Sequence, residues 1–141
     1  MWYTRTCNAL NILKDIPPLF FRLILAYGFY GPAMSKFHNI EGTTQFFANI
    51  GIPFPELSAY VVAIIEAAGV VLLILGFFTR IISLLLIIVM IVAIFTVHVS
   101  HGFSCSNHGF EIPLYYTLML FSLFIRGAGV VSIDAAFKAI F

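Results

Sequence analysis

The sequence predicts an all-α fold: an integral membrane four-helix bundle with both termini in the cytoplasm and a short C-terminal helix on the membrane surface. Three observations support this prediction. Hydrophobic residues make up 62% of the 141 residues and charged residues only 9%, far from the composition of soluble domains. Four apolar runs have about the length needed to cross a hydrocarbon core. Lys and Arg residues are also distributed unevenly between the connections.

The four predicted spans belong to a single transmembrane domain over residues 1–141. They cover residues 17–36, 57–78, 81–99 and 112–131. PPLFF and EIPLYY place prolines at the start of the first and fourth spans, where a helix tolerates a missing N–H. The first stretch is predicted to be a retained span, because no convincing small-residue cleavage site follows it.

The connections between the spans predict their orientation. GFFTRI is too short for anything but a tight hairpin, so the second and third spans are expected to be antiparallel neighbours. The two longer connections lie on the opposite face from the termini. Because positive charge near span ends is retained in the cytoplasm, the termini are predicted to be inside. The charges on the terminal side are Arg5, Lys14, Arg22, Arg80, Arg126 and Lys138, against Lys36 alone on the other side.

The C-terminal segment SIDAAFKAIF places Asp134 and Lys138 four residues apart, with apolar residues available to one face. It predicts a short helix on the cytoplasmic surface. Cys7 and Cys105 fall on opposite sides of the membrane in this topology, which argues against their pairing. No run of Lys or Arg provides the clustered charge that nucleic acid binding needs, so nucleic acid is excluded as a partner.

Glu66 lies deep inside the second predicted span. An ionised carboxylate near the middle of a membrane costs several kcal/mol, so Glu66 is expected to be paired, protonated or directed into a polar cavity. Arg22 and Arg126 are the predicted partners, because at roughly 1.5 Å rise per residue their depths differ from that of Glu66 by about 6 to 7 Å. Either arginine alone is equally compatible with snorkelling to the interface.

The segment HVSHGFSCSNHGFE concentrates candidate functional residues on the outward face. His98 and His101 are three residues apart, and Cys105 or His108 would complete a tetrahedral zinc or copper site. Histidines at the end of a membrane helix are also ordinary interface residues. In a redox role, His98 hydrogen-bonds a quinone headgroup or Cys105 exchanges with a partner's thiol. We expect His98 to point into a pocket between the helices.

Further residues are candidates for lining this pocket. If the site is catalytic, His98 and Glu66 are the candidates for handling protons. For the three tyrosines among these candidates, the alternative is a role as anchors at the membrane interface, which is the usual role of tyrosines there. The candidate cofactor-binding residues are Arg22, Tyr27, Tyr30, Tyr60 and Arg126.

Three short motifs follow one another between Arg22 and Ala136: GIPFP, the glutamate and glycines of EAAGVVLLILGFFTR, and GAG followed by SID. Together they resemble the DoxX family of small four-helix bacterial membrane proteins, and the resemblance extends from Arg22 to Ala136. The first span reads GPAMSK where the family usually has Gly-x-x-Lys. The resemblance does not extend to Cys105 or His108.

The resemblance implies a multi-pass protein of the bacterial inner membrane. Related proteins include a subunit of thiosulfate:quinone oxidoreductase and a mycobacterial component of a complex with superoxide dismutase and a sulfurtransferase. They associate the family with thiol chemistry and oxidative stress. More distant relatives act as receptor chaperones or cargo receptors.

Two classes of function are therefore expected. In the first, the chain is an oxidoreductase subunit that holds a quinone in the bilayer and receives electrons from a soluble or membrane redox partner. The sequence contains no Rossmann fingerprint, haem-attachment C-x-x-C-H or iron–sulfur spacing, so electrons must enter from outside the chain. In the second class, the chain is a non-enzymatic scaffold, chaperone or receptor whose outward loops bind a partner protein.

Overall fold

The structure, a computed structural model, describes residues 13–140, a range that contains helices and turns but no strand. Arg5 and Cys7 lie outside the described residues. The helices are α2 (Ile16–His38), α3 (Ile40–Asn49), α4 (Pro55–Leu75), α5 (Thr79–Ala93), α6 (Glu111–Arg126) and α7 (Ile133–Ile140). A π-helical turn (Ile94–His98) and a 3₁₀ turn (Val99–His101) extend α5, and a further 3₁₀ turn covers Cys105–Asn107. The predicted all-α class is confirmed.

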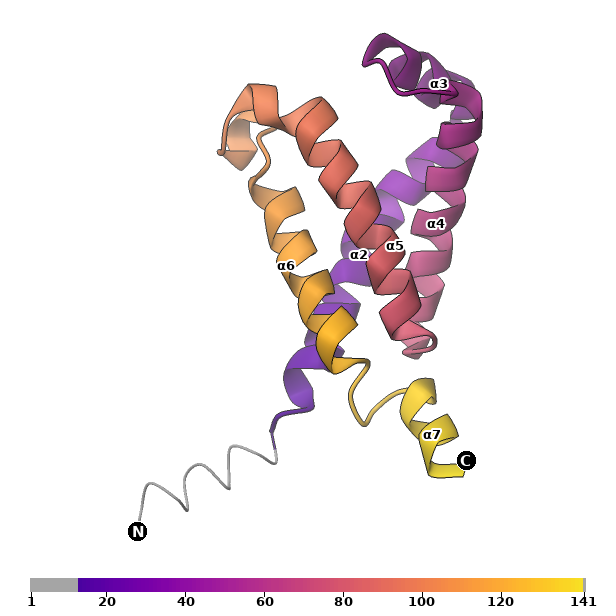
Figure 1. Cartoon of the computed structure of the whole chain (residues 1–141), viewed down its shortest axis with the longest axis vertical. Helices are drawn as coiled ribbons and strands as arrows, with labels where there is room; N and C mark the ends of the chain where they lie inside the picture. Colours follow the sequence, from indigo (N-terminus) through magenta and orange to yellow (C-terminus); the bar gives the residue numbers. More distant parts are fainter. Residues whose placement is uncertain (1–12, 141) are drawn as a thin grey trace.

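The four long helices form two pairs that cross and then separate. Figure 1 shows α2 beside α4 and α5 beside α6, with the pairs diverging toward the end that carries α3. All four helices contribute to one buried core, made of Leu25, Ala26, Phe29, Leu73, Ile82, Leu86, Leu120 and Leu123. In lipid such a core is held by close packing rather than by exclusion of water. Gly28 and Gly69 permit that closeness, because a Cβ there would clash with Tyr116 and Leu86 respectively.

The predicted hairpin between the second and third spans is confirmed. α4 ends at Leu75, Gly76 adopts a left-handed conformation with φ +64°, and α5 begins at Thr79. Asp134 at the start of α7 caps α5, because its two carboxylate oxygens accept the N–H groups of Phe78 at 2.9 Å and Thr79 at 3.0 Å. The short C-terminal helix is therefore present, and it is attached to this hairpin.

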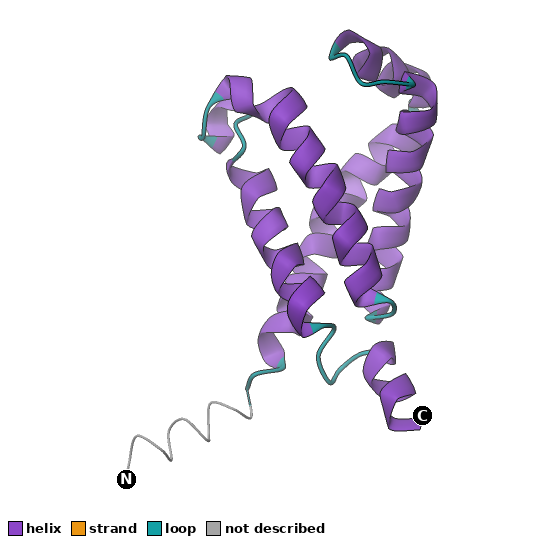
Figure 2. Ribbon diagram, in the orientation of Figure 1, coloured by secondary structure: helices purple, strands orange, loops and turns teal. Residues whose placement is uncertain are grey.

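Two boundaries differ from the sequence prediction (Figure 2). The connection after the first span was expected to be a loop, but it folds into α3, whose first turn Asn39 caps by accepting the Gly42 N–H at 2.9 Å. The fourth span was expected to reach Val131, but α6 ends at Arg126. Gly127 and Gly129 follow with φ +85° and +80°, values that L side chains rarely adopt and that turn the chain out of the helix.

By length and hydropathy, two helices of residues 13–140 qualify as membrane spans: Pro55–Leu75 and the extended helix Thr79–His101. α6 has 16 residues, or about 24 Å, which is shorter than a hydrocarbon core of about 30 Å. α2 is long enough, but Arg22 and Lys36 interrupt its apolar sequence. Four crossings and their orientation therefore remain predictions.

Candidate functional site

A cavity of about 860 Å³ occupies the space between the diverging helix pairs. Its walls come from the end of α2, from α3, from the first half of α4, and from α5 with its π-helical turn. Most lining side chains are apolar, among them Phe46, Val62, Leu85 and Val89. The polar residues that line it are Ser35, Lys36, Asn39, Thr43, Ser58, Glu66, Thr96 and His98. A large apolar cavity with few polar groups is the usual form of a small-molecule site.

A buried ion pair lies on the wall of this cavity. Lys36 Nζ is 2.7 Å from Glu66 Oε2, and the Glu66 side chain is 3% exposed while that of Lys36 is 18% exposed. The prediction that Glu66 is paired is met, but the predicted partner is wrong. The partner is neither Arg22 nor Arg126; it is Lys36, which the sequence analysis had assigned to the outward surface.

The register of α2 against α4 explains this correction. Arg22 packs directly against Gly76, because a Cβ on Gly76 would lie 1.9 Å from Arg22 Nη1. Lys36 is 14 residues from Arg22, about 21 Å along α2, and Glu66 is 10 residues from Gly76, about 15 Å along α4. The difference between these two lengths is about 6 Å, and a lysine side chain directed back along its helix can span it. The depths predicted from the sequence were measured from the outer ends of the spans, taken to lie at one level. In the structure, the outer ends of α2 and α4 are not level.

Both arginines lie at the opposite end of the molecule from the cavity. Arg22 is 1% exposed, and its Nη2 donates to the Val131 carbonyl oxygen at 2.5 Å. Its Nε and Nη1 have no hydrogen-bond partner among the residues that the structure describes. Arg126, the last residue of α6, is exposed. Neither arginine lines the cavity that contains Glu66.

His98 ends the π-helical turn and lines the same cavity as Glu66. Its Nδ1 is 2.7 Å from the carbonyl oxygen of His108. A carbonyl oxygen can only accept, so Nδ1 carries the hydrogen, and in the neutral ring Nε2 is then a proton acceptor. π-helical turns inside longer helices are frequent at functional sites, because they displace a side chain from its regular helical direction.

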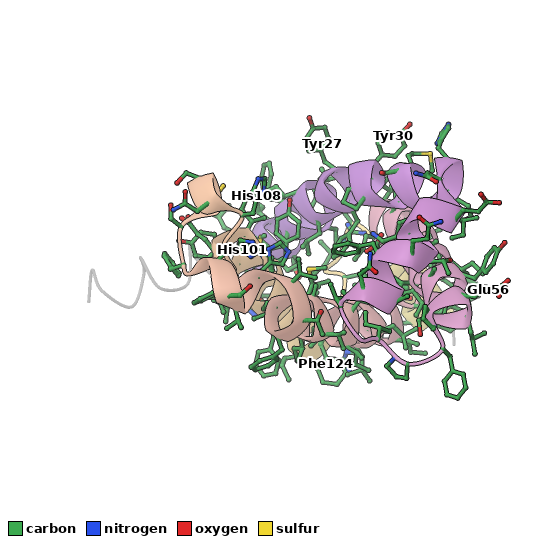
Figure 3. The ribbon with its side chains drawn as sticks, turned by 90° about the horizontal axis from the view of Figure 1, so that it is seen from above. Tyr27, Tyr30, Glu56, His101, His108 and Phe124 are labelled. Carbon is green, nitrogen blue, oxygen red and sulfur yellow. The ribbon has the colours of Figure 1, made fainter. Side chains whose placement is uncertain are left out.

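The three tyrosines proposed for the pocket do not line it. The most exposed of them, Tyr27, is 86% exposed, and Tyr30 and Tyr60 are also on the outside. Figure 3 shows Tyr27 and Tyr30 projecting from α2 away from the other helices. The buried face of α2 runs through Arg22, Leu25, Phe29 and Ala33, and Tyr27 falls nearly opposite it by helical phase. These positions suit interface anchors.

The loop 102–111 is ordered by its own hydrogen bonds. The N–H groups of Phe110 and Glu111 donate to the carbonyl oxygens of Gly102 and Phe103 at 3.1 and 3.0 Å. The Glu111 carboxylate accepts the backbone N–H of Cys105 at 2.9 Å, and the Cys105 thiol is exposed.

The candidate metal ligands of this region remain spread out. His101, Cys105 and His108 are all exposed and lie outside the cavity lining. Within residues 13–140, no group of three His, Cys, Asp or Glu side chains is close enough together to hold a metal ion. A zinc or copper site at these residues remains a prediction.

The outer faces of the long helices carry large apolar side chains. On α4 they include Ile64, Val71 and Ile74, and on α5 Leu84 and Ile91, all of them exposed. Contiguous apolar surface of this extent is unstable in water but matches the hydrocarbon of a bilayer. The fold and its apolar outer surface therefore define a small helical membrane protein.

Comparison with known proteins assigns the family. The chain belongs to the DoxX family, whose sequence profile matches residues 18–99. It is similar to the "Putative oxidoreductase CatD" of Bacillus subtilis (38% identity, covering 85% of this chain and 84% of that one). It is also similar to the "Inner membrane protein YphA" of Escherichia coli (37% identity, covering 46% and 43%). An uncharacterised protein of Haemophilus influenzae is 28% identical over 97% of this chain and 93% of its own length. No solved structure matches. The resemblance seen in the sequence motifs is confirmed.

Lys36 is the site residue that sequence reasoning missed. The signal was present, because Lys36 is the only cation on the outward side and Glu66 is the only acidic residue inside a predicted span. Pairing them required the register between α2 and α4, which is visible in the contact between Arg22 and Gly76.

Proposed function

We propose that this protein is a membrane subunit of a redox system and that its cavity binds the headgroup of a lipid-soluble quinone. The observation that supports the proposal is the position of the Lys36–Glu66 pair on the wall of a mostly apolar cavity that His98 also lines. The printed name of the Bacillus subtilis relative includes the word oxidoreductase, which agrees with this class.

The residues of the cavity fit a quinone headgroup. A volume of about 860 Å³ is in the range of small-molecule sites, and the apolar walls suit a hydrocarbon tail. The headgroup carries two carbonyl oxygens that accept hydrogen bonds, and the Lys36 ammonium can donate to one of them. When bound, a quinone supplies two-electron chemistry coupled to the uptake or release of two protons. Glu66 and the Nε2 atom of His98 are the groups of this chain that hold those protons.

Electrons must reach this cavity from another protein. The sequence carries none of the motifs that bind a dinucleotide, a covalent haem or an iron–sulfur cluster. The proposed partner is a soluble or membrane redox protein that docks on the outward end, where loop 102–111 is exposed. Thiol–disulfide exchange belongs to the same proposal: the Cys105 thiolate attacks a disulfide of the partner, a mixed disulfide forms, and the other partner sulfur leaves as a thiolate.

A scaffold function is the second candidate. The ordered, exposed loop 102–111 favours it, because a loop fixed by its own hydrogen bonds can present side chains to a partner protein. Mass spectrometry of the purified protein separates the two functions. A quinone in near-stoichiometric amount supports the redox subunit, whereas a protein that co-purifies in the consistent absence of quinone supports the scaffold.

His98→Ala is expected to lower the quinone content of the purified protein about tenfold, because it removes the Nε2 atom that accepts a hydrogen bond from a hydroxyl group of the reduced quinone in a low-dielectric cavity. Extraction followed by chromatography and mass spectrometry measures that content. His101→Ala is the matched control: it removes an imidazole of the same region that lies outside the cavity, and it should retain quinone. Unchanged quinone content in His98→Ala would contradict its assigned role. Equal losses in His101, Cys105 and His108 variants, with stoichiometric zinc or copper, would favour the metal site instead.

The proposed arrangement in the bacterial inner membrane has four passes, with the termini and Arg80 in the cytoplasm. It is supported by the Lys and Arg distribution of the sequence. Reporter domains fused after Thr43 and after Ser106 should both be active outside the cytoplasm, and one fused near the C-terminus should be active inside. Activity of either outward fusion in the cytoplasm would refute this orientation.

A further inference from the structure

A second hollow, of about 580 Å³, lies at the end of the molecule opposite the cavity. It is bounded by the start of α2, the start of α5, the loop 127–132 and α7. Three cationic side chains line it, each from a different helix: Arg80 from α5, Arg126 from α6 and Lys138 from α7. We call this hollow the basic cleft.

The acidic residues of the basic cleft offset these charges only in part. Asp134 and Asp15 also line it. Both oxygens of Asp134 are occupied by the N–H groups at the start of α5, where the helix dipole stabilises a negative charge. Asp134 keeps its charge in these hydrogen bonds, so the three cations and two carboxylates of the described residues leave the basic cleft a net formal charge of +1.

Apolar side chains border the cations. Phe78, Ile81, Val130 and Phe137 line the basic cleft, and each is more than half exposed, at 51% to 64%. Exposed apolar groups beside clustered cations match an amphiphile, whose anionic headgroup meets the charges while its hydrocarbon covers the apolar surface.

Specific contacts hold α7 in place beside the cleft. The Asp134 N–H donates to the Gly76 carbonyl oxygen at 3.0 Å, and the rings of Phe77 and Phe137 have centroids 5.8 Å apart. Lys138 lies one residue beyond Phe137. The packing of α7 thus fixes the position of Lys138 beside Arg80 and Arg126.

From this arrangement we propose that the basic cleft binds the phosphate headgroup of an anionic phospholipid. Arg126 and Lys138 bind the phosphate, and the acyl chains lie along Ile81, Val130 and Phe137. Arg80 contributes charge while its Nη2 donates to the Ile125 carbonyl oxygen at 3.1 Å, which fixes its side chain at the cleft. This site is independent of the proposed quinone cavity, because the two share no lining residue.

The test uses the full chain in a nonionic detergent and native mass spectrometry, with titration of phosphatidylglycerol or phosphatidylcholine of identical acyl chains. Phosphatidylglycerol is expected to bind about tenfold more tightly. Arg126→Gln and Lys138→Gln should each lower its affinity about fivefold, and the double variant about 25-fold, since each cation near a membrane surface contributes about that factor. Phosphatidylcholine binding should fall less, because its choline cation offsets the charge of its phosphate.

Lys14→Gln is the matched control, because Lys14 is an exposed cation at the same end that does not line the basic cleft. It should bind phosphatidylglycerol as the parent chain does. An unchanged thermal midpoint in all variants separates lost binding from lost folding. Equal binding of the two lipids, full affinity in the double variant, or displacement of the lipid by millimolar inorganic phosphate would each overturn the proposal.

Discussion

Lys36→Met is expected to lower the free energy of unfolding by about 3 kcal/mol, because it leaves the Glu66 carboxylate buried without its partner. Glu66 is 3% exposed and has a short stem, so it cannot reach water from the middle of α4. Glu66→Gln should cost less, about 1 kcal/mol, because the 18% exposed Lys36 side chain can turn toward the outward surface. Unfolding by sodium dodecyl sulfate in mixed micelles measures both.

The double variant Lys36→Met/Glu66→Gln is the decisive control. It removes both charges, so its loss of stability should be smaller than that of Lys36→Met alone. The larger loss of stability in Lys36→Met than in Glu66→Gln also separates this pairing from the one first predicted with Arg22 or Arg126. A Lys36→Met protein as stable as the parent would mean that Glu66 is not paired with Lys36.

Gly76→Ala is expected to destabilise the protein by about 3 kcal/mol or more. Gly76 has φ +64°, which costs an L residue about 1 kcal/mol, and the added Cβ would lie 1.9 Å from Arg22 Nη1 and 2.5 Å from Ser132 Cβ. Arg22 has no room to yield, since it is 1% exposed and held by the Val131 carbonyl oxygen. A strongly lowered thermal midpoint or loss of the folded protein is the expected result.

Gly31→Ala is the matched control for this substitution. Gly31 lies in the interior of α2, and a Cβ there would meet nothing within 4 Å. Alanine is the better helix former, so this variant should be as stable as the parent or more stable by about 0.5 kcal/mol. A Gly76→Ala protein that melts with the Gly31→Ala protein would show that Arg22 does not pack against Gly76.

Local signals in the sequence were sufficient for the helices themselves. Apolar runs of membrane length, prolines in the first turns and the short GFFTRI connection predicted the long helices and the tight hairpin between α4 and α5. They also identified the DoxX family. The α3 helix was missed because its apolar content is modest and its start depends on a local Asn39 cap rather than on a long apolar run.

What the sequence by itself determined is thus the class of protein, its helical segments and the need for Glu66 to have a partner. The identity of that partner was decided only by tertiary structure, because ion pairing depends on the relative register of two helices. That register results from the packing of α2 against α4 along their length, and it also places Arg22 against Gly76, far from the pair. Tertiary structure likewise decided which residues share each of the two hollows. Glu66 and His98 share one cavity, and Arg80, Arg126 and Lys138 share another, because separate helices diverge or meet there. Periodicity within one segment carries no information about the distance between two segments.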